Sequence, residues 1–121
     1  MNKNKSFIQS EHDLQVCCIN WFRAKYSTEI IFSIPNGGQR NIIVATKLKA
    51  EGVLSGVPDL FVMLSKGGFH GLYIEMKCKG GKLTENQKQF FKTATNKGYL
   101  CSKCESFEDF HNTITTYMKM P

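Results

Sequence analysis

Two short apolar runs on either side of a glycine-containing turn constrain the fold of this chain most strongly. Residues 61–64 (Phe-Val-Met-Leu) and 71–74 (Gly-Leu-Tyr-Ile) have the length and composition of strands, and residues 65–68 (Ser-Lys-Gly-Gly) have the composition of a turn. We therefore predict a β-hairpin. With the turn centred on Gly67, Asp59 lies opposite Glu75.

Asp59, Glu75 and Lys77 would then form one polar cluster. Opposed strand residues have Cβ atoms roughly 5 Å apart, and two carboxylates at that distance repel each other unless a cation lies between them. Carboxylate oxygens suit Mg²⁺ or Mn²⁺. Lys77 shares a strand face with Glu75, so its charge could orient an attacking water or neutralise a phosphate. Taken alone, Glu-x-Lys is also typical of a solvated strand edge.

The rest of the chain alternates between helical and strand patterns. We expect helices over about residues 11–25 and 42–51, a helix opened by a Thr84–Gln87 capping box, and a last helix starting at Ser106. Strands are expected over residues 30–34 and 99–101. This order predicts an α/β domain with a central mixed sheet flanked by helices. The first helix should bury Leu14, Cys17, Cys18, Trp21 and Phe22, and the second Ile42, Ala45 and Leu48 or Lys49.

Two further polar residues are placed near the cluster by helical spacing. Glu11 lies in the first turn of the first helix, three residues before Leu14, and therefore points toward the buried side. A helix-dipole role explains Glu11 equally well. Gln87 precedes Phe90 and Phe91 by three and four residues, so it shares their inward face and points at the sheet.

Composition bounds the class of protein. The 121 residues suit one domain, with residues 1–9 as a flexible segment. Sixteen Lys and Arg against ten Asp and Glu give a net charge of +6, which favours a polyanionic partner. No apolar run reaches membrane-span length and no signal peptide is apparent, so we expect no membrane partner and a cytoplasmic location, in a bacterium or a phage-infected cell. The five cysteines should be reduced, and Cys101-x-x-Cys104 lacks the second ligand pair of a structural zinc site.

Several stretches, taken in order, resemble the virus-type replication-repair nuclease (VRR-NUC) family of the PD-(D/E)xK nuclease superfamily. They are residues 34–40 (Ile-Pro-Asn-Gly-Gly-Gln-Arg), 47–52 (Lys-Leu-Lys-Ala-Glu-Gly), 56–60 (Gly-Val-Pro-Asp-Leu), 73–77 (Tyr-Ile-Glu-Met-Lys) and 83–87 (Leu-Thr-Glu-Asn-Gln). The resemblance implies a restriction-endonuclease-like core. It also implies that Asp59, Glu75 and the backbone carbonyl of Met76 bind Mg²⁺ or Mn²⁺, and that the catalytic residues are Glu11, Asp59, Glu75, Lys77 and Gln87.

The chain resembles the compact members of this family, and this resemblance implies a homodimer that cuts branched DNA such as four-way junctions. We therefore expect a metal-dependent, structure-selective DNA endonuclease that acts as a homodimer. The alternatives are a nicking or restriction-type endonuclease acting on ordinary duplex, and a non-catalytic DNA-binding module with a nuclease fold. We expect six residues to contact DNA, mainly at its phosphates: Asn36, Arg40, Lys47, Lys49, Lys79 and Lys82. For each basic residue among them, a solvated surface charge is the competing explanation.

Overall fold

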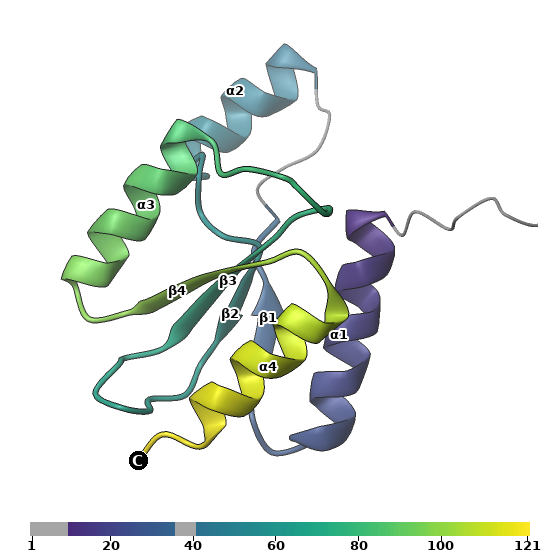
Figure 1. Ribbon diagram of the computed structural model, residues 1–121. Helices are drawn as coiled ribbons and strands as arrows, with labels where there is room; N and C mark the ends of the chain where they lie inside the picture. The colour runs from purple at the N-terminus through teal and green to yellow at the C-terminus, as the bar shows by residue number, and fades with distance from the viewer. Residues whose placement is uncertain (1–9, 36–40) are drawn as a thin grey trace, which may run out of the picture.

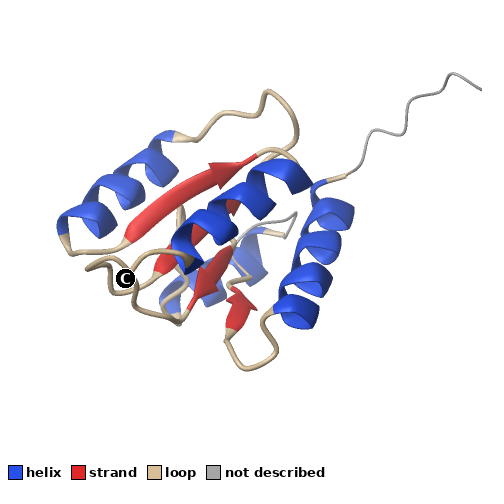
Figure 2. Ribbon diagram, turned by 60° about the horizontal axis from the view of Figure 1, so that its bottom comes forward, coloured by secondary structure: helices blue, strands red, loops and turns tan. Residues whose placement is uncertain are grey.

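The structure, a computed structural model, describes residues 10–35 and 41–121. Its centre is one sheet made of β1 (Ile31–Ser33), β2 (Leu60–Val62), β3 (Leu72–Met76) and β4 (Leu100–Cys104). Neighbouring strands follow chain order, and β1–β2 and β2–β3 are antiparallel. Strand β4 instead runs parallel to β3, and a helix provides the crossover connection that parallel neighbours need (Figure 2). The predicted mixed sheet is confirmed.

Helices flank this sheet on both faces, as predicted for the α/β class. Figure 1 shows α1 and α4 side by side on one face, in contact with each other. On the other face α3 contacts the sheet, through β4 and through an edge-to-face ring contact between Phe90 and Tyr73. The predicted order of elements is confirmed. The helices of the described residues are α1 (Glu11–Lys25), α2 (Ile42–Ala50), α3 (Glu85–Asn96) and α4 (Phe107–Met118).

The main core lies between the sheet and the α1–α4 pair. Side chains alternate along each strand, so every second residue of β3 faces these helices: Leu72, Ile74 and Met76 are buried there. The residues between them, Tyr73 and Glu75, face α3. The helices contribute Leu14, Cys18 and Phe22 from α1 and Phe110, Ile114 and Tyr117 from α4.

The hairpin has the register predicted from its turn. Leu60 pairs with Ile74, Phe61 with Tyr73 and Val62 with Leu72, and the same register continued by one residue sets Asp59 opposite Glu75. The strand bounds differ from the prediction, since β2 ends at Val62 and β3 extends to Met76. Gly67 and Gly68 have φ values of 60° and 83° in the turn, a backbone conformation that favours glycine.

The prediction that Cys17 is a core residue is wrong, because Cys17 is exposed. Successive helix residues point about 100° apart. Helix α1 meets the core through the narrow row Leu14, Cys18 and Phe22, and Cys17 lies outside that row.

The predicted inner face of α2 is also wrong. None of the described residues of this helix is buried, and the side chains of Ile42 and Ile43 are 83% and 74% exposed. Figure 1 shows the reason: α2 lies beyond the end of the strands, where it does not cover a sheet face. Leu48 is the most enclosed of its described residues, near Pro35 and Val53.

Candidate active site

Asp59 is held at the start of β2 by bonds to both neighbouring strands. Its carboxylate Oδ2 accepts a hydrogen bond of 2.8 Å from the backbone N–H of Met76 on β3. Its carbonyl oxygen accepts one of 2.7 Å from the N–H of Ile34, just after β1. The position of Asp59 is therefore fixed by the sheet, although the residue precedes the first paired residue of β2.

Gly56 allows the segment before Asp59 to run close to the start of α3. It has a φ of 95°, and a Cβ atom there would lie 2.5 Å from the carbonyl oxygen of Asn86. A larger residue would therefore push the two segments apart. Asn86 also donates a side-chain hydrogen bond of 3.0 Å to Ser55. This approach brings the N-terminal turn of α3, which carries Gln87, next to the two acidic strands.

Glu75 is buried, with only 4% of its surface exposed. Its Oε2 accepts a hydrogen bond of 3.0 Å from Nε2 of Gln87 and lies 3.6 Å from Nζ of Lys77. Its Oε1 is buried and bonds to no donor within residues 10–35 and 41–121. A buried carboxylate oxygen without a partner is costly, so the site is suited to an additional cation or proton.

The two acids titrate abnormally for the same reason. Burial and then the charge of Asp59 raise the pKa of Glu75 to about 7, against the opposing effect of Lys77. Burial likewise raises the pKa of Asp59; Glu11 adds to this rise, whereas the hydrogen bond from Met76 opposes it. Burial and the neighbouring carboxylates thus disfavour the ionised form of both acids, and a cation bound between them would favour it.

Gln87 has two roles at the start of α3. Its side-chain oxygen accepts a hydrogen bond of 2.8 Å from the N–H of Thr84, and the Thr84 hydroxyl accepts one of 3.2 Å from the N–H of Gln87. This is the predicted capping box. Because its oxygen is used in the cap, the amide nitrogen of Gln87 is directed at Glu75.

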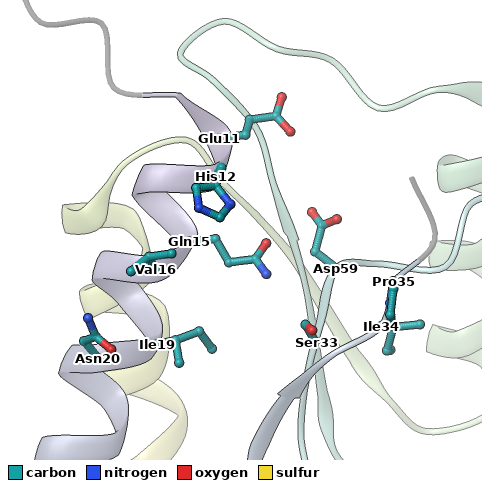
Figure 3. A pocket seen from close by; sticks show the side chains of 10 residues that line it. All are labelled: Glu11, His12, Gln15, Val16, Ile19, Asn20, Ser33, Ile34, Pro35 and Asp59. Atoms are coloured by element: carbon teal, nitrogen blue, oxygen red, sulfur yellow. The ribbon is translucent and has the colours of Figure 1, made fainter. Parts of the chain in front are cut away.

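Glu11 faces Asp59 across an open pocket of about 610 Å³. Figure 3 shows Glu11 and Gln15 projecting from α1 toward Asp59, with Ser33 on the opposite wall. Sequence reasoning missed Gln15. Its position four residues after Glu11 on the same helical face was the available signal.

The expected DNA-contacting residues are only partly described. Asn36 and Arg40, like the expected flexible segment 1–9, lie outside the described residues. Lys47 and Lys49 are exposed on α2, and Lys79 and Lys82 are exposed in the loop between β3 and α3. Figure 1 shows α2, this loop and the N-terminal end of α1 at the same end of the sheet.

A cation bound at this site would have two carboxylate ligands, Asp59 and Glu75, from the strand region. Among the residues that the structure describes, no group of three or more His, Cys, Asp or Glu side chains is placed to hold a metal. Mg²⁺ typically binds one or two protein carboxylates and keeps several waters, which fits Asp59 and Glu75. The carbonyl of Met76 remains a predicted third ligand. Cys101 and Cys104 lie three residues apart on β4 and therefore on opposite sheet faces.

Comparisons with known proteins agree with this fold. The sequence profile of the VRR-NUC domain matches residues 4–108. A solved structure described as a VRR_NUC domain protein is similar, with a TM-score of 0.77 and 26% identity over 93% of this chain and 90% of that one. No protein with a curated description matches the chain.

The fold and these similarities place the protein among nucleases with an α/β core. The chain belongs to the VRR-NUC family. In the described part of the chain, no helix is long and apolar enough to cross a membrane.

Proposed function

We propose that this protein is a Mg²⁺- or Mn²⁺-dependent endonuclease that hydrolyses phosphodiester bonds in branched DNA, such as four-way junctions. The observation that supports the metal site most is the buried Oε1 of Glu75, which accepts no hydrogen bond from the described residues. The carboxyls of Glu75 and Asp59 also interact, and the pKa of each is raised. Branched DNA is proposed from the resemblance to compact members of the family.

Asp59, Glu75 and the Met76 carbonyl are the proposed ligands of the ion. When bound, a divalent cation would polarise the phosphoryl group and stabilise the charge that grows on the leaving oxygen. Its charge would also offset the repulsion between the two carboxylates.

The protein's own side chains orient the substrate and the attacking water. Lys77 holds a positive charge 3.6 Å from Glu75, where it can neutralise a phosphate oxygen or orient the water. Gln87 fixes the rotamer of Glu75 through its 3.0 Å hydrogen bond. Glu11 faces the site from the far wall of the pocket, where its carboxylate can accept a hydrogen bond from a water.

Lys47, Lys49, Lys79 and Lys82 are the proposed phosphate contacts among the described residues. Contacts to phosphates release counterions, so the affinity for DNA should fall steeply as salt rises and depend little on base sequence. Fluorescence anisotropy between about 50 and 200 mM salt measures this. An affinity that does not change with salt would argue against these contacts.

We further propose a homodimer, which would offer two equivalent sites to a roughly two-fold junction. An apolar surface suited to self-association lies at the β1 edge of the sheet. Ile30, Phe32 and Met63 are 49%, 41% and 53% exposed there, and they share the sheet face with Phe61. We call these three residues the edge patch.

The test is a cleavage panel of matched duplex, flap, splayed-arm and four-way-junction DNA, with Mg²⁺, Mn²⁺ or chelator. We expect metal-dependent cleavage that is fastest on the junction, and loss of cleavage with retained folding and DNA binding in Glu75→Ala. Preferential cutting of plain duplex would instead support a nicking or restriction-type enzyme. Binding without any cleavage would support a non-catalytic DNA-binding module.

A further inference from the structure

The loop between β3 and α3 is tied to the end of β4 by two side chains. Nζ of Lys103 donates a hydrogen bond of 2.9 Å to the carbonyl oxygen of Gly81. Oε1 of Glu105 accepts one of 2.6 Å from the N–H of Gly80. Lys103 and Glu105 also form an ion pair of 3.0 Å with each other. One charged pair thus holds the N–H of Gly80 and the carbonyl of Gly81, two consecutive residues of the loop.

These anchors belong to rigid parts of the fold. Lys103 pairs with Glu75 in the parallel β3–β4 register, and the N–H of Lys77 donates to the carbonyl of Cys104 at 2.9 Å. The N–H of Glu105 donates to Oδ2 of Asp109 at 3.0 Å, in the first turn of α4. The pair therefore connects the loop to strand β4 and helix α4.

The anchored loop packs against the catalytic lysine. A Cβ atom added at Gly81 would lie 3.0 Å from Cβ and 3.4 Å from Cδ of Lys77, so the backbone at Gly81 touches the aliphatic part of that side chain. Only 15% of the Lys77 side chain is exposed. The Gly81 backbone on one side and the sheet on the other leave Nζ directed at Glu75.

From this chain of contacts we propose that Lys103 and Glu105 are positioning residues, which hold the loop at Gly80 and Gly81 and thereby aim Lys77 at the reaction centre. The role assigned to Lys77 rests on the proposed nuclease function. We call the pair of Lys103 and Glu105 the clamp. The clamp also sets where the exposed Lys79 and Lys82 meet DNA, because both lie in the loop that it holds. The pKa of Glu105 is lowered, first by the hydrogen bond from Gly80 and then by Lys103, so this carboxylate is ionised at neutral pH.

Lys103→Met and Glu105→Gln test the clamp, and Lys103→Arg should restore it, because an arginine can donate to both the Gly81 carbonyl and Glu105. Gly81→Ala leaves both charges in place and disturbs the contact with Lys77 together with the turn of the loop, because the added Cβ would also lie 2.9 Å from the carbonyl oxygen of Cys78. Lys88→Met is the matched control, since Lys88 belongs to an exposed 3.5 Å pair with Glu85 on α3.

Two readouts need no DNA. Hydrogen exchange of the Gly80 amide should accelerate in Lys103→Met and Glu105→Gln but not in Lys88→Met. The Cε–Hε NMR signal of Lys77, in protein labelled with ¹³C-lysine, should shift in these two variants and in Gly81→Ala. Unchanged exchange at Gly80 would overturn the clamp, and an unmoved Lys77 signal would overturn the positioning of Lys77.

The third readout is the single-turnover cleavage rate at saturating DNA. A displaced catalytic group typically costs on the order of tenfold to a hundredfold in rate, so we expect a loss of that size in Lys103→Met, a much smaller change in DNA affinity, and recovery in Lys103→Arg. A rate that stays at the wild-type value while Gly80 exchanges faster would contradict the proposal. If the wild-type protein cleaves no DNA, the proposed function fails, whereas Gly80 exchange and the Lys77 signal still decide the clamp.

Discussion

Glu75 combines burial, an adjacent carboxylate and an oxygen without a donor in the described part of the chain. Each of these features alone destabilises its charged form. Gln87 and Lys77 both contact Oε2 and leave Oε1 without compensation. At the residue scale, the ionised form of Glu75 therefore lacks compensating positive charge, and a divalent cation is the simplest group that would supply it.

The stability of the metal-free protein should fall as pH rises through the titration of Glu75. The folded protein holds this proton up to a pKa of about 7, whereas the unfolded chain releases it near the ordinary value of 4.5. Between those values the folded state binds more protons than the unfolded state, so the free energy of unfolding decreases as the pH rises through this range. Urea denaturation with chelator across this range measures the slope.

Glu75→Gln is the control for this prediction, because it removes the titrating group and keeps the shape of the side chain. The variant should be more stable than the wild type at neutral pH without metal, and saturating Mg²⁺ should narrow the difference by stabilising the wild type. Equal stabilities of the two proteins at neutral pH, with the same pH slope, would contradict the account of Glu75.

At the scale of elements, the start of α3 joins capping to site geometry. Gln87→Leu should lose one half of the capping box and also the hydrogen bond to Glu75. We expect a loss of about 1 kcal/mol in stability and on the order of tenfold to a hundredfold in cleavage rate. Thermal denaturation and single-turnover kinetics measure the two effects.

Thr84→Ala separates these effects, because it removes the hydroxyl that caps the N–H of Gln87 and leaves the Gln87 amide in place. Its stability should fall by a similar amount, with little change in rate. If both variants lost rate equally, the hydrogen bond from Gln87 to Glu75 would have no specific role.

The elements also show what the sequence could predict. The register of β2 with β3 followed from the turn, since a centre at Gly67 gives the observed strand pairs and, by continuation, sets Asp59 opposite Glu75. The N-terminal turns of α3 and α4 were readable because capping is local. The exposure of α2 was not readable, because helical periodicity marks an apolar face without saying whether anything covers it.

Contacts between distant segments were beyond the sequence for a similar reason. Lys103 lies between Cys101 and Cys104, whose C-x-x-C spacing is one that zinc sites use. Its bond to Gly81 depends on the parallel pairing of β3 with β4, which no local pattern specifies. The sequence thus predicted that Asp59 lies opposite Glu75, whereas the contacts around Lys77 depend on how distant segments pack.

At the scale of the whole molecule, the proposed dimer has a direct readout. Light scattering at micromolar concentration should give about twice the chain mass of 13.7 kDa. Phe32→Ser with Met63→Ser should shift the protein toward the monomer, because both changes remove apolar area from the edge patch. Ile42→Ser is the control, as this isoleucine is more exposed but lies on α2.

A monomer mass for the wild type, with or without junction DNA, would reject the dimer and favour a nicking enzyme. A dimer that persists in the doubly substituted protein, but is lost in Ile42→Ser, would move the interface from the edge patch to α2.

The central claim is that Asp59 and Glu75 together hold a divalent cation. The most direct measurement is calorimetric titration of the metal-free protein with Mn²⁺ at neutral pH, for the wild type, Asp59→Asn, Glu75→Gln and the control Lys88→Met. We predict that the wild type and Lys88→Met bind Mn²⁺ with the same affinity, and that each acid substitution weakens binding by at least about tenfold. Mn²⁺ binding as tight in Asp59→Asn and Glu75→Gln as in the wild type, or no binding to the wild type, would contradict the claim.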